Sequence, residues 1–128
     1  MNRQDIIKRL NSFPYSKDEY WVITGSAMVL YGIKEMTHDI DIGCTSRMAD
    51  QLEKDGYVPT LTESGNRKFL IGDNIEIFEN WKYGSIERIE EIPVLSLEGL
   101  IEMKQSLGRE KDIKDITLIK EFRQKRLG

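Results

Sequence analysis

Two aspartates separated by one residue, Asp39 and Asp41, have the clearest capacity for chemistry in this sequence. They alternate with Ile40 and Ile42, a pattern typical of a strand with one face in a core. Side chains two residues apart on a strand share a face, about 6–7 Å apart. Carboxylates this close repel unless one holds a proton or a cation lies between them, and such pairs often hold Mg²⁺ with substrate phosphates. The alternative is a solvated edge strand whose acids only discourage strand pairing.

A glycine and a serine, Gly25 and Ser26, lie between an aromatic and β-branched segment, 20–24, and an apolar segment, 27–31. This order predicts a strand followed by a helix. Backbone N–H groups at a helix start, together with the positive end of the helix dipole, bind phosphate. The glycine would let a phosphate approach the backbone, and the serine hydroxyl would donate to it. Alternatively, Ser26 is only an N-cap. The acidic strand that follows favours the phosphate site.

A third carboxylate, Glu76, is flanked by Ile75 and Ile77 in the same way as Asp41 is flanked by isoleucines. If its strand pairs beside the acidic strand, Glu76 joins the cluster as a metal ligand or general base. The alternative is a solvated side chain. Glu79, three residues later, is expected to face the other side of the strand.

One lysine, Lys104, falls within the apolar arc of a helix predicted to start at Ser96. A lysine on a buried face needs a partner or a route to water. It would reach a triphosphate or the carboxylates. The alternatives are snorkelling, or an ion pair with Asp112 or Asp115.

The elements that must position these residues follow from periodicity and turn residues. They predict an α+β fold, a small mixed sheet flanked by helices, in one domain spanning 1–128. The C-terminal helices, 96–126, are expected to pack on the sheet, with Ile113, Ile116, Ile119 and Phe122 inward. The expected helices are 4–13, 27–31, 48–55, 96–107 and 110–126, and the expected strands are 20–24, 38–43, 57–58, 67–71, 75–78 and 86–95, the last interrupted by Pro93.

The composition excludes several classes of protein. The chain has 128 residues, a net charge of −3, one cysteine and one histidine, which excludes an internal disulfide framework and a cysteine-based zinc site. It has neither an apolar run long enough to cross a membrane nor a secretory signal, so we expect a cytoplasmic protein without a membrane partner.

Charge is unevenly distributed along the chain. Residues 1–100 hold 11 Lys and Arg against 17 Asp and Glu, and residues 101–128 hold 8 against 5. The acidic body argues against a broad nucleic-acid surface. The basic end fits a small anionic ligand or a limited RNA contact, or simply a solvated terminal helix.

Taken together, these motifs resemble the nucleotidyltransferase superfamily related to DNA polymerase β. The resemblance covers approximately Trp21 to Phe122 and includes small bacterial members: abortive-infection and toxin–antitoxin nucleotidyltransferases and lincosamide- or aminoglycoside-modifying enzymes. The motifs that carry it are Ile23-Thr24-Gly25-Ser26, His38-Asp39-Ile40-Asp41-Ile42, Ile75-Glu76-Ile77, Val94-Leu95-Ser96-Leu97-Glu98, Lys104 and Arg109-Glu110-Lys111-Asp112-Ile113-Lys114-Asp115.

The resemblance implies a Mg²⁺-dependent enzyme that moves a nucleoside monophosphate from a nucleoside triphosphate to a hydroxyl, releasing pyrophosphate. Asp39 and Asp41, with Glu76, would hold one or two Mg²⁺ ions. Gly25 and Ser26 would bind the β- and γ-phosphates, and Glu76 would deprotonate or orient the acceptor. Many members have aspartate at this third position.

The acceptor is left open by the sequence: a small molecule such as an antibiotic, a tRNA end or a protein side chain. The short chain lacks an evident second domain, which points to an acceptor site completed by a homodimer or a small helical partner protein. A second hypothesis is a non-catalytic or partner-dependent interaction protein of the toxin–antitoxin type on the same fold. A third is a nucleotide- or metal-binding module without an acceptor.

Overall fold

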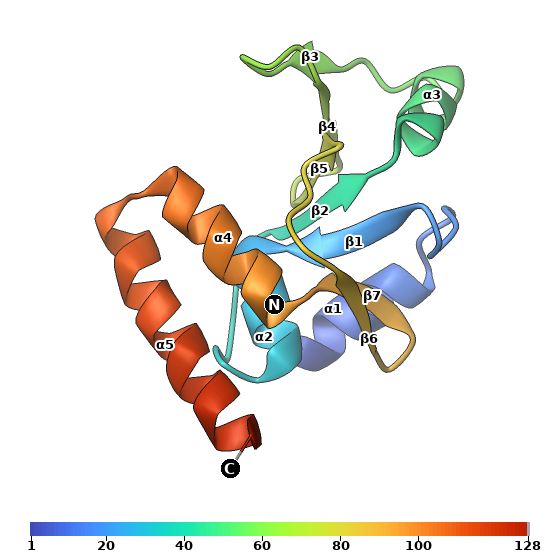
Figure 1. Ribbon diagram of the computed structural model, residues 1–128. Helices are drawn as coiled ribbons and strands as arrows, with labels where there is room; N and C mark the ends of the chain where they lie inside the picture. The colour runs from blue at the N-terminus through green and yellow to red at the C-terminus, as the bar shows by residue number, and fades with distance from the viewer. Residues whose placement is uncertain (128) are drawn as a thin grey trace.

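Residues 1–127 are described by a computed structural model, in which a mixed sheet of seven strands is flanked by five helices (Figure 1). The expected α+β class is therefore confirmed. The helices are α1 (Arg3–Asn11), α2 (Thr24–Tyr31), α3 (Ser46–Lys54), α4 (Leu97–Leu107) and α5 (Glu110–Leu127). The strands are β1 (Tyr20–Ile23), β2 (Ile40–Cys44), β3 (Thr60–Leu61), β4 (Arg67–Ile71), β5 (Ile75–Glu79), β6 (Ile86–Ile89) and β7 (Ile92–Leu95).

The strand order, β3-β4-β5-β2-β1-β7-β6, places the acidic strand β2 at the centre of the sheet. β2 runs antiparallel to β1 and parallel to β5. Because β2 is paired on both sides, it is not the solvated edge strand considered as the alternative for Asp39 and Asp41.

Strand register gives the sheet two distinct faces. Val22, Ile42 and Ile77 are partners across β1, β2 and β5, so their side chains share one face. All three are buried in the hydrophobic core. Asp41 and Glu76 alternate with them and therefore project from the opposite face, which we call the site face.

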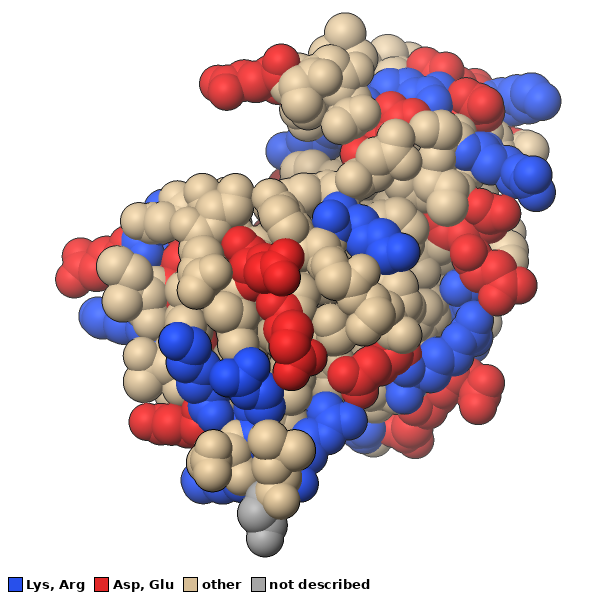
Figure 2. Space-filling model, viewed as in Figure 1, with Lys and Arg blue, Asp and Glu red and all other residues tan. Residues whose placement is uncertain are grey.

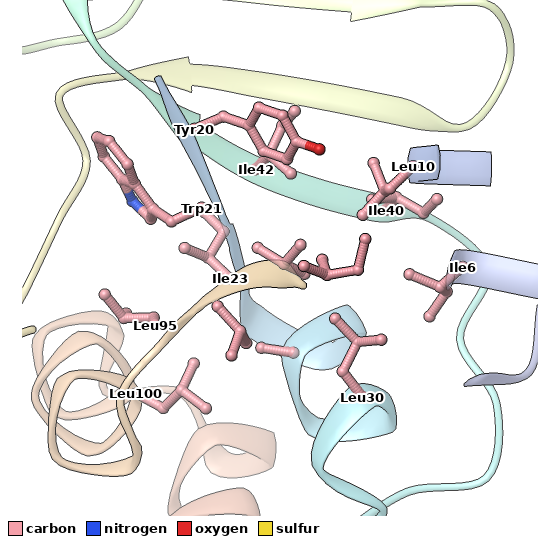
Figure 3. Packing of buried hydrophobic residues seen from close by; sticks show 14 of the residues in the cluster. Ile6, Leu10, Tyr20, Trp21, Ile23, Leu30, Ile40, Ile42, Leu95 and Leu100 are labelled. Atoms are coloured by element: carbon pink, nitrogen blue, oxygen red, sulfur yellow. The ribbon is translucent and has the colours of Figure 1, made fainter. Parts of the chain in front are cut away.

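The core joins the sheet to α1, α2 and α4. Figure 3 shows Ile6 and Leu10 of α1, Leu30 of α2 and Leu100 of α4 in one cluster with Tyr20, Trp21, Ile23, Ile40, Ile42 and Leu95. Burying a large aliphatic side chain stabilises a fold by about 1.5–3 kcal/mol, so these strands and helices are strongly held in place.

The last two helices form a pair beside α2 (Figure 1). Ser96 accepts a hydrogen bond from the Gly99 amide and so caps α4, and Gly108, with a φ of +63°, ends it. α5 buries Ile119, and Phe122 meets Tyr31 of α2 edge-on, with ring centroids 6.1 Å apart. The inward position expected for Ile113 is wrong, because that side chain is 61% exposed. No helix within residues 1–127 combines the length and apolar character needed to span a bilayer.

Several element boundaries differ from the expectations. α2 begins three residues earlier than expected, at Thr24. The strand expected at 57–58 is absent, and the short β3 at 60–61 pairs with β4 instead. The single strand expected at 86–95 is a hairpin, because Glu90 and Glu91 both have positive φ. Two consecutive positive φ values are typical of tight hairpin turns.

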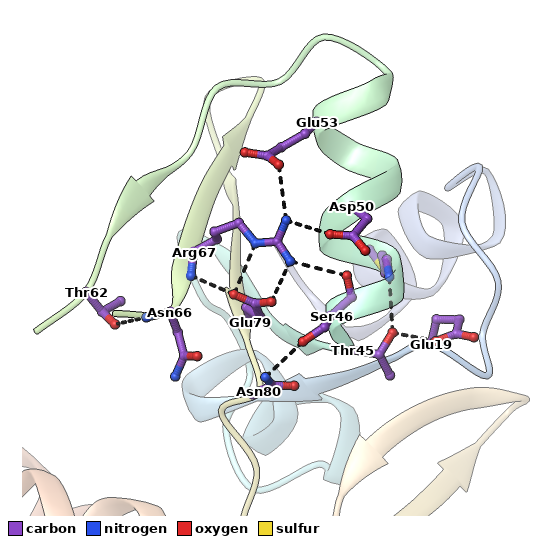
Figure 4. A network of polar contacts seen from close by, with 11 residues as sticks. Glu19, Thr45, Ser46, Asp50, Glu53, Thr62, Asn66, Arg67, Glu79 and Asn80 are labelled. Carbon is purple, nitrogen blue, oxygen red and sulfur yellow. Dashed lines mark hydrogen bonds and ion pairs between the residues drawn. The ribbon is translucent and has the colours of Figure 1, made fainter. Parts of the chain in front are cut away.

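Arg67, at the start of β4, ties this end of the sheet to α3 (Figure 4). Its guanidinium donates to both carboxylate oxygens of Glu79, at 2.6 and 3.1 Å, and also to Asp50 and Glu53 of α3. Glu79 is buried on the face opposite Glu76, as the alternation along β5 predicted. Hydrogen bonds from Arg67 hold the pKa of Glu79 at about 2.

Replacing Glu79 with glutamine is therefore expected to lower the free energy of unfolding at pH 7 by about 2 kcal/mol, the range for hydrogen bonds to charged groups. A depressed carboxyl pKa stabilises the fold above the unfolded pKa, near 4.5, and this contribution is lost as pH falls toward about 2. Urea unfolding of both proteins at pH 7 and pH 3 measures the difference. An equal loss of stability at both pH values would contradict this assignment.

Candidate active site

Asp41 and Glu76 lie side by side on the site face. They are register partners in the parallel pair β2–β5, and both side chains are partly exposed. Residues in register on neighbouring strands have Cα atoms about 5 Å apart. The strand pairing on which a role for Glu76 depends is therefore present, and it brings the two carboxylates together.

Asp39 lies just before β2, at the end of the loop that follows α2, and is exposed. It lines the same cleft as Asp41 and Glu76. Its position outside the regular strand gives its side chain more freedom than that of Asp41. Among residues 1–127 no three His, Cys, Asp or Glu side chains are gathered as a preformed metal cluster.

Thr24 turns the chain from β1 into α2 in a strained conformation. Its φ is +55°, a region that β-branched residues rarely adopt and that costs about 1–3 kcal/mol. In this position its hydroxyl donates to Asp41 Oδ2 at 2.5 Å. The strained residue is therefore the one whose hydrogen bond orients the Asp41 carboxylate.

Ser26 is fully buried and connects the same two strands. Its hydroxyl donates to the Ile23 carbonyl at 2.8 Å and accepts a hydrogen bond from the Asp41 amide at 3.0 Å. Both bonds are internal, so the hydroxyl serves the β1–α2 junction in this structure. The backbone amides of Thr24, Gly25 and Ser26 begin α2 and, like all first-turn amides, have no acceptor within the helix.

The Asp41 carboxylate is poorly stabilised by the protein itself. Burial raises its pKa, the Thr24 hydrogen bond lowers it, and the nearby carboxylates of Glu76 and Asp39 raise it further, leaving it above the ordinary value. Its Oδ1 atom is buried and has no hydrogen-bond partner among the described residues. A buried anionic oxygen without a partner is costly, so a cation or a hydrogen-bond donor beside this atom would stabilise it.

The cleft around these carboxylates has a volume of about 460 Å³ and is lined by residues from α2, β2, β5, α4 and α5. One side carries Asp39, Asp41 and Glu76. The cationic side chains that line the cleft are Lys34, Lys104, Arg109 and Lys111. Negative and positive groups therefore share one cavity.

Lys104 is buried and forms ion pairs with Asp112 and Asp115, the alternative to a direct role in binding triphosphate. Its ammonium lies 3.0 Å from Asp115 Oδ2 and 3.6 Å from Asp112 Oδ1. Arg109 donates to both oxygens of Asp112, at 2.6 and 3.1 Å, and Lys34 lies 2.9 Å from Asp115. We call these five residues the ion network. Lys104 reaches the cleft wall, but its charge is already used within the network.

The ion network also shifts the titration of its two acids. Hydrogen bonds from Arg109 hold the pKa of Asp112 below its ordinary value. Burial alone would raise the pKa of Asp115, but hydrogen bonds from Lys34 and Lys104 outweigh it, and the pKa is lowered. Both acids therefore stay ionised, and they hold α4, α5 and the loop after α2 together.

Thr24, Lys34 and Lys111 are among the cleft residues that the sequence reasoning did not assign to the site. Lys111 forms no ion pair among the described residues, which makes it the unpaired cation of the cleft wall. The periodicity of α5 does not indicate that Lys111, near the start of this helix, faces the cleft. Thr24 offered a sequence signal, because a residue directly before Gly25-Ser26 had to make the turn.

Known proteins resemble this chain in structure but not in sequence. The sequence matches no protein-family model and no curated protein. The chain is similar in structure to a Thermotoga maritima protein provisionally assigned as a nucleotidyltransferase, with 18% identity over 91% of this chain and 93% of that one and a TM-score of 0.64. The lincosamide adenylyltransferase LnuA, solved with lincomycin bound, aligns over 93% of this chain and 92% of its own, with 16% identity and a TM-score of 0.48. The Thermotoga similarity shows that this chain shares the fold of that protein.

Proposed function

We propose that this protein is a Mg²⁺-dependent nucleotidyltransferase, which transfers a nucleoside monophosphate from a nucleoside triphosphate to a hydroxyl group and releases pyrophosphate. The observation that carries the proposal is the register of Asp41 with Glu76 beside the open first turn of α2. The carboxylates and the start of α2 line one cleft there, together with Lys111, which has no ion pair among residues 1–127. We expect the reaction in the cytoplasm, where triphosphates and Mg²⁺ are abundant.

The donor set suits magnesium. Mg²⁺ is usually held by one or two carboxylates and substrate phosphates rather than by an all-protein cage, so two or three carboxylates suffice without a preformed cluster. Asp41, whose buried Oδ1 lacks a partner, and Asp39 would hold the ion, with Glu76 beside them. When bound, the metal would supply charge stabilisation for the attacking and leaving oxygens.

The protein's own groups would position the nucleotide. The Gly25 amide, with the positive end of the α2 dipole, would bind the β- and γ-phosphates. Ser26, which is buried, would support this turn through the hydrogen bonds of its hydroxyl. Lys111 would neutralise a further phosphate charge on the leaving side, while Lys104 would act through the ion network that shapes the wall. Positioning and charge neutralisation account for most of the barrier lowering in such displacements.

Glu76 would accept the acceptor hydroxyl proton or orient that hydroxyl for attack at the α-phosphorus. Lys68 lies beside it, with its ammonium 4.0 Å from Glu76 Oε1. The bond from the acceptor oxygen to the α-phosphorus forms as the bond to the bridging oxygen of pyrophosphate breaks.

Gly25 offers a test that separates binding from folding. A Cβ added there would meet nothing closer than Thr37 Oγ1, at 3.6 Å, so the apo fold tolerates alanine. At the phosphate site the same methyl group would obstruct the approach to the amides. Gly25→Ala is thus expected to keep the thermal midpoint within about 2 °C and to weaken Mg²⁺·ATP binding at least tenfold.

The measurement is calorimetric titration of each nucleoside triphosphate with and without Mg²⁺, on wild type, Gly25→Ala and Asp39→Asn. Gly32→Ala cannot serve as the control, because Gly32 has a φ of +87°, which alanine rarely adopts. A substitution at Ala27 cannot serve either, because that side chain is fully buried. Asp73→Asn, in the exposed β4–β5 turn, is the matched surface control. Well-folded wild type that binds no triphosphate would overturn the proposal and favour a partner-dependent interaction protein.

A further inference from the structure

The ion network contains more positive than negative side chains. Its cations are Lys34, Lys104 and Arg109, and its anions are Asp112 and Asp115. All of them except Asp112 line the cleft beside the proposed metal ligands. A network with a surplus cation at a cavity wall can give up that cation to an anionic ligand while both of its acids stay paired. The cation that is held least firmly is the one that a ligand can take.

Lys34 is the cation held least firmly. Its side chain is 35% exposed and forms one ion pair within residues 1–127, with Asp115 Oδ1 at 2.9 Å. Lys104 is buried and lies between both acids, and Arg109 donates to both oxygens of Asp112. Because Lys104 lies 3.0 Å from the other oxygen of Asp115, that acid keeps a partner when Lys34 leaves. Partly exposed ion pairs contribute little to stability, so this one is readily exchanged.

The loop that carries Lys34 borders the start of α2. This loop, 32–39, joins α2 to β2 and ends at Asp39. The hydroxyl oxygen of Thr37, three residues after Lys34, lies 3.6 Å from the position that a Cβ on Gly25 would take. Lys34, Thr37, Asp39 and Gly25 line the same cleft. Lys34 therefore belongs to the segment that adjoins the first turn of α2, where the phosphates would bind.

The basic C-terminal end of the chain lies outside the cleft. Figure 2 shows Lys and Arg side chains grouped around the C-terminal end of α5, at the bottom of the view. Arg123 and Arg126 of this region pair with Glu98 and Glu87, and within residues 1–127 none after Asp115 lines the cleft. An anion bound in the cleft must therefore be neutralised by the cations of the cleft wall.

We propose that Lys34 is a second phosphate ligand, which a bound triphosphate draws away from Asp115. This inference rests on the proposed transferase function and adds to it a residue and a change of partner. A triphosphate stays negative after one Mg²⁺ is bound, and Lys111 supplies a single charge. Lys34 adds another, because a charged amine forms strong hydrogen bonds with phosphate oxygens. Lys104 and Arg109 keep their aspartates, so α4 and α5 stay joined. Asp115 competes with the phosphates for Lys34 and thereby weakens triphosphate binding.

Inorganic tripolyphosphate with Mg²⁺ isolates the phosphate contacts, because it has neither base nor sugar. Lys34→Met is expected to weaken its binding about tenfold in calorimetry, and Lys34→Arg is expected to retain most of the affinity, because guanidinium also pairs with phosphate. Lys114→Met is the matched control: Lys114 precedes Asp115 and is exposed but does not line the cleft. No loss with Lys34→Met, or an equal loss with Lys114→Met, overturns the proposal.

Thermal unfolding separates a ligand from a structural tether. Because its ion pair is partly exposed, Lys34→Met should keep the midpoint of the free protein within about 2 °C of wild type. A fall of more than about 5 °C would show that Lys34 holds the loop to α5, and it would overturn the assignment of Lys34 as an exchangeable cation.

A double-mutant cycle with Asp115→Asn tests the change of partner. Asparagine removes the competing charge and keeps an oxygen for Lys104. Loss of Lys34 should then weaken tripolyphosphate binding about threefold more in the Asp115→Asn protein than in wild type. Equal effects in the two backgrounds would show that the charges act independently, and they would contradict the exchange.

The exchange can also be followed in wild type, without any change at Asp115. The NMR signal of the Lys34 ammonium, assigned with Lys34→Arg, is expected to shift when Mg²⁺·tripolyphosphate is added, and an unchanged signal at saturation overturns the proposal. Well-folded wild type that binds neither Mg²⁺·ATP nor Mg²⁺·tripolyphosphate defeats the proposed function. Wild type that binds both, with Lys34→Met binding equally well, defeats this inference alone.

Discussion

Replacing Asp41 with asparagine is expected to lower nucleotidyl transfer by about a thousandfold while raising the stability of the fold. The loss of activity follows from the metal and nucleotide site, because Asp41 provides the buried Oδ1 that lacks a partner. Mg²⁺-dependent binding of triphosphate should disappear with the activity. Asparagine keeps the shape of the side chain and an oxygen that accepts from Thr24.

The gain in stability follows from the raised pKa of Asp41. Ionising this group in the fold is opposed by burial and by two nearby carboxylates, so the charged form destabilises the native state above its folded pKa. Removing the charge should therefore raise the thermal midpoint, and each gain of about 1 kcal/mol in the free energy of unfolding would appear as a rise of about 4 °C. As pH falls below the folded pKa, Asp41 is itself neutral, and the difference between the two proteins should vanish.

Thermal unfolding of wild type and Asp41→Asn at pH 8 and pH 4, without Mg²⁺, measures this effect. Asp73→Asn, which removes an exposed carboxylate outside the cleft, serves as the control and should leave the midpoint and the transfer rate unchanged. A destabilised Asp41→Asn protein at pH 8 would show that the carboxylate is stabilised in a way the structure does not contain. Full transfer activity would remove Asp41 from the mechanism.

Replacing Lys104 with methionine is expected to lower the free energy of unfolding by about 3 kcal/mol, the lower end for a broken buried ion pair. Lys104 is 4% exposed and lies between Asp112 and Asp115. Arg109 and Lys34 would still face these aspartates, which keeps the loss at the lower end. The predicted fall in thermal midpoint is about 12 °C.

Lys111→Met is the matched comparison, because Lys111 lines the same cleft without an ion pair among the described residues. It should keep the wild-type midpoint and weaken triphosphate binding about tenfold. Urea unfolding and calorimetry on both variants separate the two roles. If Lys104→Met retained full stability and lost nucleotide binding alone, Lys104 would be a direct ligand and not a member of a structural network.

The α+β class and most elements were predictable from local patterns. Alternation around Asp41 and Glu76 marked the buried strands, the Gly72-Asp73-Asn74 turn marked the β4–β5 hairpin, and Ser96 and Gly108 marked the ends of α4. These signals depend on residues close together in sequence, whose conformational preferences act whatever the rest of the chain does. The hairpin within 86–95 was missed because two glutamates, not glycine or asparagine, occupy its positive-φ turn.

The sequence alone determined which residues had the chemistry: the paired aspartates, the third acid, the Gly25-Ser26 junction and the buried lysine. Only the tertiary structure decided how they meet. Pairing of β2 with β5 set Asp41 beside Glu76, the ion network took up Lys104, and packing left Lys111 without an ion pair among residues 1–127. Such contacts depend on strand register and helix packing between segments far apart in the chain, which periodicity within one segment does not encode.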